Sequence, residues 1–271
     1  MEQAPPSLEA VFPAGNLFRK VVDHLRLLYK EIVVQCYVST EGAGGISLRA
    51  TDQNQSSVLH AYLGVCAMER FACSEFVSRR FSAQVLSKMF RAVGQDDGFF
   101  LETEDDTSLS FHFRLHGMIT ASFQQRAITD VAEAPVAVAD EDSMQFATSV
   151  SMPASRLQSA FRGLGVLGDD WGDIVRIEVQ PGGMRLTFVS DASQGEVVLS
   201  PEDGREEVTI LCGEPIKLAF SMGFLTRFTK AAPAEATATL SLSSGKPLRL
   251  SFEFPNSDVG FIRFFLCPVQ E

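Results

Sequence analysis

Nine basic side chains are concentrated in four short segments whose apolar residues recur at helical spacing. They are Arg19, Lys20, Arg26, Lys88, Arg91, Arg156, Arg162, Arg227 and Lys230. The same segments hold one acid, Asp23, although the chain contains 23 basic and 34 acidic residues and has a formal net charge of −11. Arginine and lysine grouped on one surface attract the phosphates of a nucleic-acid backbone. This segregation of charge predicts a nucleic-acid contact on a protein that is acidic on average.

The spacing of these cations favours shared helix faces. Lys88 and Arg91 are three residues apart, as are Arg227 and Lys230, and residues three apart in a helix are neighbours on its surface. The alternative is that they belong to ordinary solvated faces, an explanation that suits one such helix better than four. The sequence offers no zinc module or aromatic stacking platform beside them. We therefore expect weak, salt-sensitive contact without sequence readout.

Other motifs indicate turns and structural thiols rather than catalysis or cofactor binding. Gly163–Gly168 matches G-x-G-x-x-G, but it closes a predicted helix, whereas the dinucleotide-binding motif opens one. Cys66 and Cys73 have no second Cys or His pair at zinc spacing. The acidic loop around Trp171 lacks the spacing and terminal Glu of an EF-hand. No candidate Ser or Cys nucleophile lies in an elbow motif or has a catalytic base beside it in the sequence. From these motifs together we predict no enzyme activity, no metal and no cofactor.

Length and composition restrict the class of protein. The chain has 271 residues, of which 45% are apolar and 21% charged, and this is typical of a globular protein with one large or two medium domains. No apolar run approaches the length of a membrane span, and the N-terminus lacks the pattern of a signal peptide. Five scattered cysteines favour a reducing compartment over a disulfide framework. We predict no membrane partner.

Helices predicted over residues 16–29, 82–93, 154–164 and 221–230 carry the basic residues. Apolar and polar residues alternate over 108–115 and 248–254, a pattern typical of antiparallel sheet with one solvated face. Turns are expected just before those strands, at 104–106 and 243–245. The predicted class is α+β, with mostly antiparallel sheet and two short helices in each half.

The sequence contains an internal repeat. Residues 81–91 recur as 220–230, an offset of 139, and the alternating apolar residues of 109–113 recur at the same offset in 248–252. Several repeated segments in the same order predict two similar domains. We place these domains at 1–128 and 146–271. Residues 129–145 form the connector between them, because their Ala, Val and acid content is typical of an extended linker.

Particular segments resemble a known family. They are Gly45–Asp52, Leu86–Gly94, Glu214–Phe220, Phe228–Pro233, Lys246–Leu248 and Phe264–Pro268. Together with the duplication and the helix charges, they identify the chain as similar to the eukaryotic sliding clamps of the proliferating cell nuclear antigen (PCNA) family. The resemblance covers nearly all of the chain after about residue 7.

The resemblance implies a fold, an assembly and a role. It implies the DNA clamp fold and a ring-forming homotrimer that encircles duplex DNA, with the basic helices lining the hole. Strands near 119–127 and 196–200 are expected to join subunits edge to edge. It further implies a nuclear processivity factor for DNA polymerase. Such a clamp is also a docking hub for the clamp loader and for clamp-binding-motif proteins in DNA replication and DNA repair.

Clients of this family insert a short motif with aromatic and aliphatic anchors under the connector. The implied walls of that pocket are Thr51, Val58, Val136, Val138, Pro247, Phe265 and Cys267. The connector has Ala and Val where the family usually has Leu and Ile, so we expect a shallower pocket or an altered preference for clients. Two positions that are basic in the family are occupied by Ser159 and Gly223, with Arg156 and Arg227 nearby. The lysine commonly modified in the family would fall near Pro181, where there is none.

Two alternatives stay open. In the first alternative, the chain is a subunit of a heterotrimeric checkpoint clamp in DNA damage signalling. In the second, it is a monomeric interaction scaffold that forms no ring. The altered connector and the absent lysine leave room for the first alternative, whereas the close match of the C-terminal half favours the homotrimeric clamp.

Overall fold

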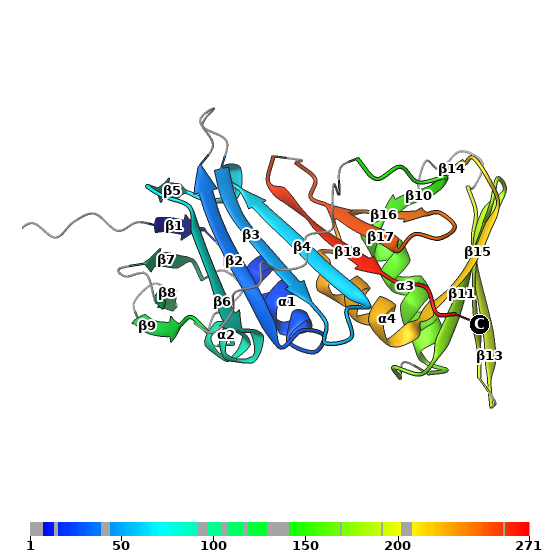
Figure 1. Cartoon of the computed structure of the whole chain (residues 1–271), viewed down its shortest axis with the longest axis horizontal. Helices are drawn as coiled ribbons and strands as arrows, with labels where there is room; N and C mark the ends of the chain where they lie inside the picture. The colour runs from blue at the N-terminus through cyan, green and yellow to red at the C-terminus, as the bar shows by residue number, and fades with distance from the viewer. Residues whose placement is uncertain are drawn as a thin grey trace, which may run out of the picture. The chain divides into compact units, whose positions relative to one another are not determined.

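The computed structural model in Figure 1 describes residues 8–13, 16–38, 44–91, 97–103, 108–115, 119–128, 141, 143–168, 170–190, 192–201, 208–256 and 258–270. The chain divides into two compact units. The first consists of Met1–Gln53, Leu59–Ala137 and Asn256–Phe261, and the second of Asn54–Val58, Val138–Pro255 and Ile262–Glu271. Each unit therefore includes a short segment from elsewhere in the chain.

The elements β1 to β9, with two helices, come first along the chain. They are β1 (Leu8–Phe12), α1 (Asn16–Leu25), β2 (Glu31–Val38), β3 (Gly44–Thr51), β4 (Ser57–Gly64), a 3-10 turn (Val65–Ala67), β5 (Arg70–Cys73), β6 (Val77–Ser82), α2 (Ala83–Phe90), β7 (Phe99–Thr103), β8 (Ser108–Leu115) and β9 (Ile119–Arg126).

The elements β10 to β18 follow in the same pattern. They are β10 (Thr148–Pro153), α3 (Ala154–Gly165), β11 (Ile174–Gln180), β12 (Gly183–Val189), β13 (Gln194–Leu199), β14 (Thr209–Cys212), β15 (Ile216–Ser221), α4 (Met222–Ala231), β16 (Thr237–Leu242), β17 (Leu248–Glu253) and β18 (Gly260–Leu266).

The strand order repeats between the two units. The order β5-β1-β7-β8-β9 in the first corresponds to β14-β10-β16-β17-β18 in the second, and β4-β3-β2-β6 corresponds to β13-β12-β11-β15. Each strand number rises by nine. The offset of 139 also relates the starts of β6 and β15, at Val77 and Ile216, and of α2 and α4, at Ala83 and Met222. The predicted α+β class, with two similar domains of antiparallel sheet and two short helices each, is confirmed.

Strict alternation of apolar residues builds the core of the second unit. On β11, Val175, Ile177 and Val179 are fully buried, and α3 packs across the neighbouring strands β10, β13 and β16. Phe228 of α4 stacks on Phe264 of β18 with ring centroids 4.1 Å apart. Burying such side chains supplies most of the favourable free energy of folding, so the helices are held with their apolar stripes inward.

Helix ends follow from local hydrogen bonding. Ser82 precedes α2 and its Oγ accepts a hydrogen bond from the backbone N–H of Val85 at 3.4 Å, as expected of an N-cap.

The predicted end of the first helix is wrong, because α1 ends at Leu25 rather than at residue 29. The N–H of Leu28 donates to the carbonyl of Leu25, a three-residue step that tightens the last turn before β2 begins. Arg26 therefore follows α1 instead of lying within it.

The predicted turn at 243–245 joins β16 to β17, and Gly245 has φ +71°, a conformation that glycine adopts without strain. The predicted turn at 104–106 and most of the connector at 129–145 lie outside the described residues. Within the described part of the chain, no helix has the length and apolar character needed to cross a membrane.

Candidate nucleic-acid interface

The basic residues lie on two helix pairs, one in each unit. In the first unit α1 packs on α2, and in the second α3 packs on α4, which Figure 1 shows side by side. Buried residues such as Leu157 and Phe161 of α3, and Leu225 and Phe228 of α4, face the sheets. The cations occupy the remaining surface of each helix, because their charge is not stable in the apolar core.

In the first pair, Asp23 links the two helices. Its Oδ1 accepts a 2.6 Å hydrogen bond from Ser87 Oγ of α2. Its carboxylate also lies 3.8 Å from Arg19 Nε and 4.0 Å from Arg91 Nε. The single acid of the four helices therefore offsets part of the charge of two arginines, whose side chains are 36% and 53% exposed. Lys88 is exposed and Arg26 half-buried, while the side chain of Lys20 lies outside the described residues.

In the second pair, a glutamine fixes one helix against the other. Gln158 Nε2 of α3 donates to the carbonyls of Thr229 and Ala232 at the end of α4, at 3.0 and 2.9 Å. Arg162 and Lys230 are exposed and lie in the last turns of α3 and α4, where the helix dipole favours cations. Arg156 and Arg227 are half-buried. All nine predicted cations thus fall on or directly after these helices.

Trp171 is a residue of this surface that the sequence analysis missed. Its ring lies under the guanidinium of Arg227, with the Arg227 Cζ 4.0 Å from the ring centroid, and the residue is 47% exposed. Arg227 Nη1 also donates to the carbonyl of Gly223 at 2.8 Å. The sequence feature that could have drawn attention to Trp171 is that it is the single tryptophan of the chain, in the loop that follows α3.

The residues assigned to a client pocket are distributed over both units. Thr51 belongs to the first unit, and Val58, Pro247, Phe265 and Cys267 to the second. Cys267 is exposed, and its N–H donates to the carbonyl of Ser56 at 2.9 Å, which ties the C-terminal segment to the start of β4. Phe265 is only 2% exposed. Val136 and Val138 lie outside the described residues.

Six strands lie at the ends of their sheets in the described part of the chain: β5, β9, β14, β6, β13 and β15. Both β9 and β13 are among them, so the edge positions predicted near 119–127 and 196–200 are confirmed, and the pairing of these strands between subunits stays a prediction. Such an edge offers unpaired backbone groups to a further strand. On β13, Val198 is 53% exposed.

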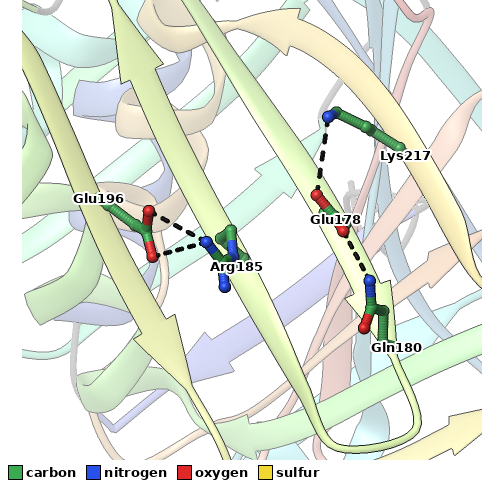
Figure 2. Close-up of polar contacts among 5 residues, drawn as sticks. All are labelled: Glu178, Gln180, Arg185, Glu196 and Lys217. Atoms are coloured by element: carbon green, nitrogen blue, oxygen red, sulfur yellow. Dashed lines mark hydrogen bonds and ion pairs between the residues drawn. The ribbon is translucent and has the colours of Figure 1, made fainter.

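The outer face of the β13-β12-β11-β15 sheet is polar and of mixed charge. Figure 2 shows the ion pair between Arg185 of β12 and Glu196 of the neighbouring strand β13, in which Arg185 Nη1 lies 3.1 Å from Glu196 Oε1. Glu178 lies 3.7 Å from Lys217 Nζ and accepts a 2.7 Å hydrogen bond from Gln180. Acids and bases alternate here, whereas the helix pairs carry almost only bases.

The five cysteines are free thiols. Burial raises the pKa of the Cys36 thiol far above its ordinary value, and burial also raises that of Cys73, whose Sγ donates to the carbonyl of Glu75. The described residues contain no group of three or more His, Cys, Asp or Glu side chains arranged to hold a metal ion.

Two units of the same strand order, each with a pair of helices, are the fold of the DNA sliding clamps. The model of the N-terminal domain of proliferating cell nuclear antigen matches residues 7–128, and the model of its C-terminal domain matches residues 140–269. The chain therefore belongs to the PCNA family.

Two relatives match nearly the whole length of this chain. The chain is 27% identical to the proliferating cell nuclear antigen of Dictyostelium discoideum over 270 residues, which cover 97% of this chain and 99% of that protein. The crystal structure of the proliferating cellular nuclear antigen of Entamoeba histolytica superposes with a TM-score of 0.81 at 20% identity. That match covers 98% of this chain and 100% of the other.

Removing the charge of Asp23 is expected to strengthen binding to duplex DNA. In Asp23→Asn the side-chain oxygen still accepts the hydrogen bond from Ser87, but Arg19 and Arg91 lose their anionic partner. We expect the dissociation constant for a labelled duplex to fall about two- to fivefold at low salt, measured by fluorescence anisotropy. Glu253→Gln, an exposed position at the end of β17, makes the same change of net charge elsewhere. An equal gain in both variants would contradict a local role for Asp23.

Proposed function

We propose that the protein is a sliding clamp that encircles duplex DNA, acts as a processivity factor for DNA polymerase, and is a docking hub for replication and repair proteins. The observation that carries this proposal is the charge of the helix pairs. Nine bases and one acid lie on or beside four helices of a clamp fold, in a chain whose formal net charge is −11. Positive charge is concentrated on the helices, and a surface that binds a polyanion is expected to show such a concentration.

The proposed mechanism needs no chemical step. A closed ring stays on DNA by topology, so its lining must contact phosphates weakly enough to slide. Exposed cations such as Lys88, Arg162 and Lys230 supply such contacts, because each phosphate contact is individually weak and is screened by salt. The partial neutralisation of Arg19 and Arg91 by Asp23 keeps the attraction modest. We propose that the protein is a tether and not an enzyme.

The proposed assembly is a homotrimer. Each subunit contributes domains at 1–128 and 146–271 with a connector at 129–145, and the edges of β9 and β13 pair between neighbours. Strand pairing satisfies the backbone groups of both edges, which favours a closed ring over an open chain end. The proposed compartment is the nucleus, where the clamp loader, the polymerase and clamp-binding-motif proteins are the partners.

Reversing the charge of the lining is expected to abolish stimulation of a DNA polymerase. The variant replaces Lys88, Arg91, Arg227 and Lys230 by Glu, which turns attraction for phosphate into repulsion while leaving the buried stripes unchanged. The measurement is the length of products made on a primed circular template after loading. Circular dichroism checks that the fold is kept.

A smaller pair of variants supplies the control for total charge. Lys88→Glu with Lys230→Glu is compared with Arg70→Glu and Lys217→Glu, two exposed cations outside the helices, since both pairs change the net charge equally. We expect the first pair to shorten the products and the second to have little effect. Undiminished stimulation by the fourfold variant contradicts the assignment of the lining.

The native mass distinguishes the proposed homotrimer from the alternatives. Light scattering at several protein concentrations and near-physiological salt is expected to give about 89 kDa, three times the 29.6 kDa of one chain, without change on dilution. A persistent monomer is the contrary result. It would mean that the edges of β9 and β13 do not fit each other, and would favour a checkpoint clamp with different partner subunits, or a scaffold that forms no ring.

A clamp-binding-motif peptide is expected to protect one thiol from alkylation. Cys267 and Cys66 are both exposed, but only Cys267 belongs to the proposed client pocket. Bound peptide should slow alkylation of Cys267 in proportion to the fraction of clamp occupied and leave Cys66 unaffected. Mass spectrometry of the digested protein reads both sites in one sample. Protection of neither thiol, or of both equally, contradicts the placement of the pocket.

A further inference from the structure

The loop between α3 and β11 places an aromatic ring against the basic face of α4. Trp171 stacks on the guanidinium of Arg227 and contacts Phe224 edge to face, with ring centroids 5.0 Å apart. The guanidinium therefore lies against the indole face, where the partial negative charge of the π electrons attracts a cation. With nearly half of its surface exposed, Trp171 is not a core residue whose only role is packing.

The loop that carries Trp171 is fixed by hydrogen bonds. Ser221 Oγ donates to the carbonyl of Trp171 at 2.9 Å, and the N–H of Met222 donates to the carbonyl of Asp173 at 2.8 Å. Asp173 Oδ2 accepts from the N–H of Asp170 at 3.0 Å. These bonds tie the loop to the start of α4, so the position of the indole is set by the same backbone that begins the helix.

A glycine makes room for the arginine. Long side chains in a helix point toward its N-terminus, so Arg227 covers the turn that contains Gly223. A β-carbon on Gly223 would lie 3.1 Å from Arg227 Nη1, closer than side chains normally approach. The guanidinium thus lies over Gly223 and donates to its carbonyl at 2.8 Å, which places the charge of residue 227 at the turn of residue 223.

We propose that Trp171 is a positioning residue that holds Arg227 over Gly223 as a preformed contact for a DNA phosphate. The inference rests on the proposed function and adds a residue to it. Stacking on the indole and the hydrogen bond to the Gly223 carbonyl fix the plane of the guanidinium, so less side-chain freedom is lost when a phosphate binds.

The chain contains its own reporter for this contact, because Trp171 is its one tryptophan. Binding of a labelled duplex is measured by anisotropy as a function of salt, and tryptophan emission is followed in the same titration with unlabelled duplex. The variants are Trp171→Ala, Trp171→Phe, Arg227→Ala and the double variant Trp171→Ala with Arg227→Ala. Arg162→Ala, an exposed cation on α3, is the matched control. Circular dichroism confirms that each variant is folded.

We expect Trp171→Ala to weaken duplex binding about two- to fivefold, and Trp171→Phe, which retains an aromatic face, to restore most of that loss. Arg227→Ala should lower the salt slope by about one, and adding Trp171→Ala to it should cause little further loss. In the wild type and in Arg162→Ala, tryptophan emission should change with a midpoint matching the anisotropy, and Arg227→Ala should abolish that change.

Three results would overturn the proposal, and they separate it from the proposed function. If the wild type binds duplex but Trp171→Ala binds equally well, Trp171 does not position Arg227, although the clamp function stands. If the losses of the two single variants simply add in the double variant, the residues act independently. If the wild type binds no duplex even at low salt, the proposed function fails together with this inference.

Discussion

Burial of the apolar stripe of each helix against the sheets behind it is the constraint on which the surface depends. Phe228 and Leu225 of α4 are fully buried, and burial of each such side chain is worth about 1.5–3 kcal/mol relative to exposure. Turning the helix about its axis would expose these side chains and bury Lys230 and Arg227, a doubly unfavourable change. The apolar core therefore determines which face of each helix carries the basic residues.

The charge on that surface is not uniform. Asp23 and Ser87 draw Arg19 and Arg91 into a network between α1 and α2, whereas Trp171 and the Gly223 carbonyl hold Arg227 within the second unit. One arrangement reduces the net charge and the other orients a cation without reducing its charge. On the proposed function, attraction for phosphate is thus set separately in the two units, although the strand order of the units corresponds throughout.

Periodicity and the repeat were sufficient to predict the class, the duplication and the positions of α2, α3 and α4. These succeed because capping residues such as Ser82 and apolar spacing act locally. The end of α1 was missed because it depends on a tightened turn that the sequence does not mark. The contacts of Asp23 with Ser87 and of Trp171 with Arg227 were also beyond prediction, because each joins residues far apart in the chain. Only tertiary packing brings such pairs together.

The open edge of β13 has a consequence for the isolated chain. Its backbone presents a row of donors and acceptors beside the exposed Val198, and an edge of this kind pairs with any extended peptide that reaches it. The ion pair between Glu196 and Arg185 places charge near that edge, which disfavours indiscriminate pairing. In the proposed homotrimer, the neighbour's strand that completes this sheet would also cover an edge prone to β-aggregation, so the solubility of the chain would depend on the supply of its partner.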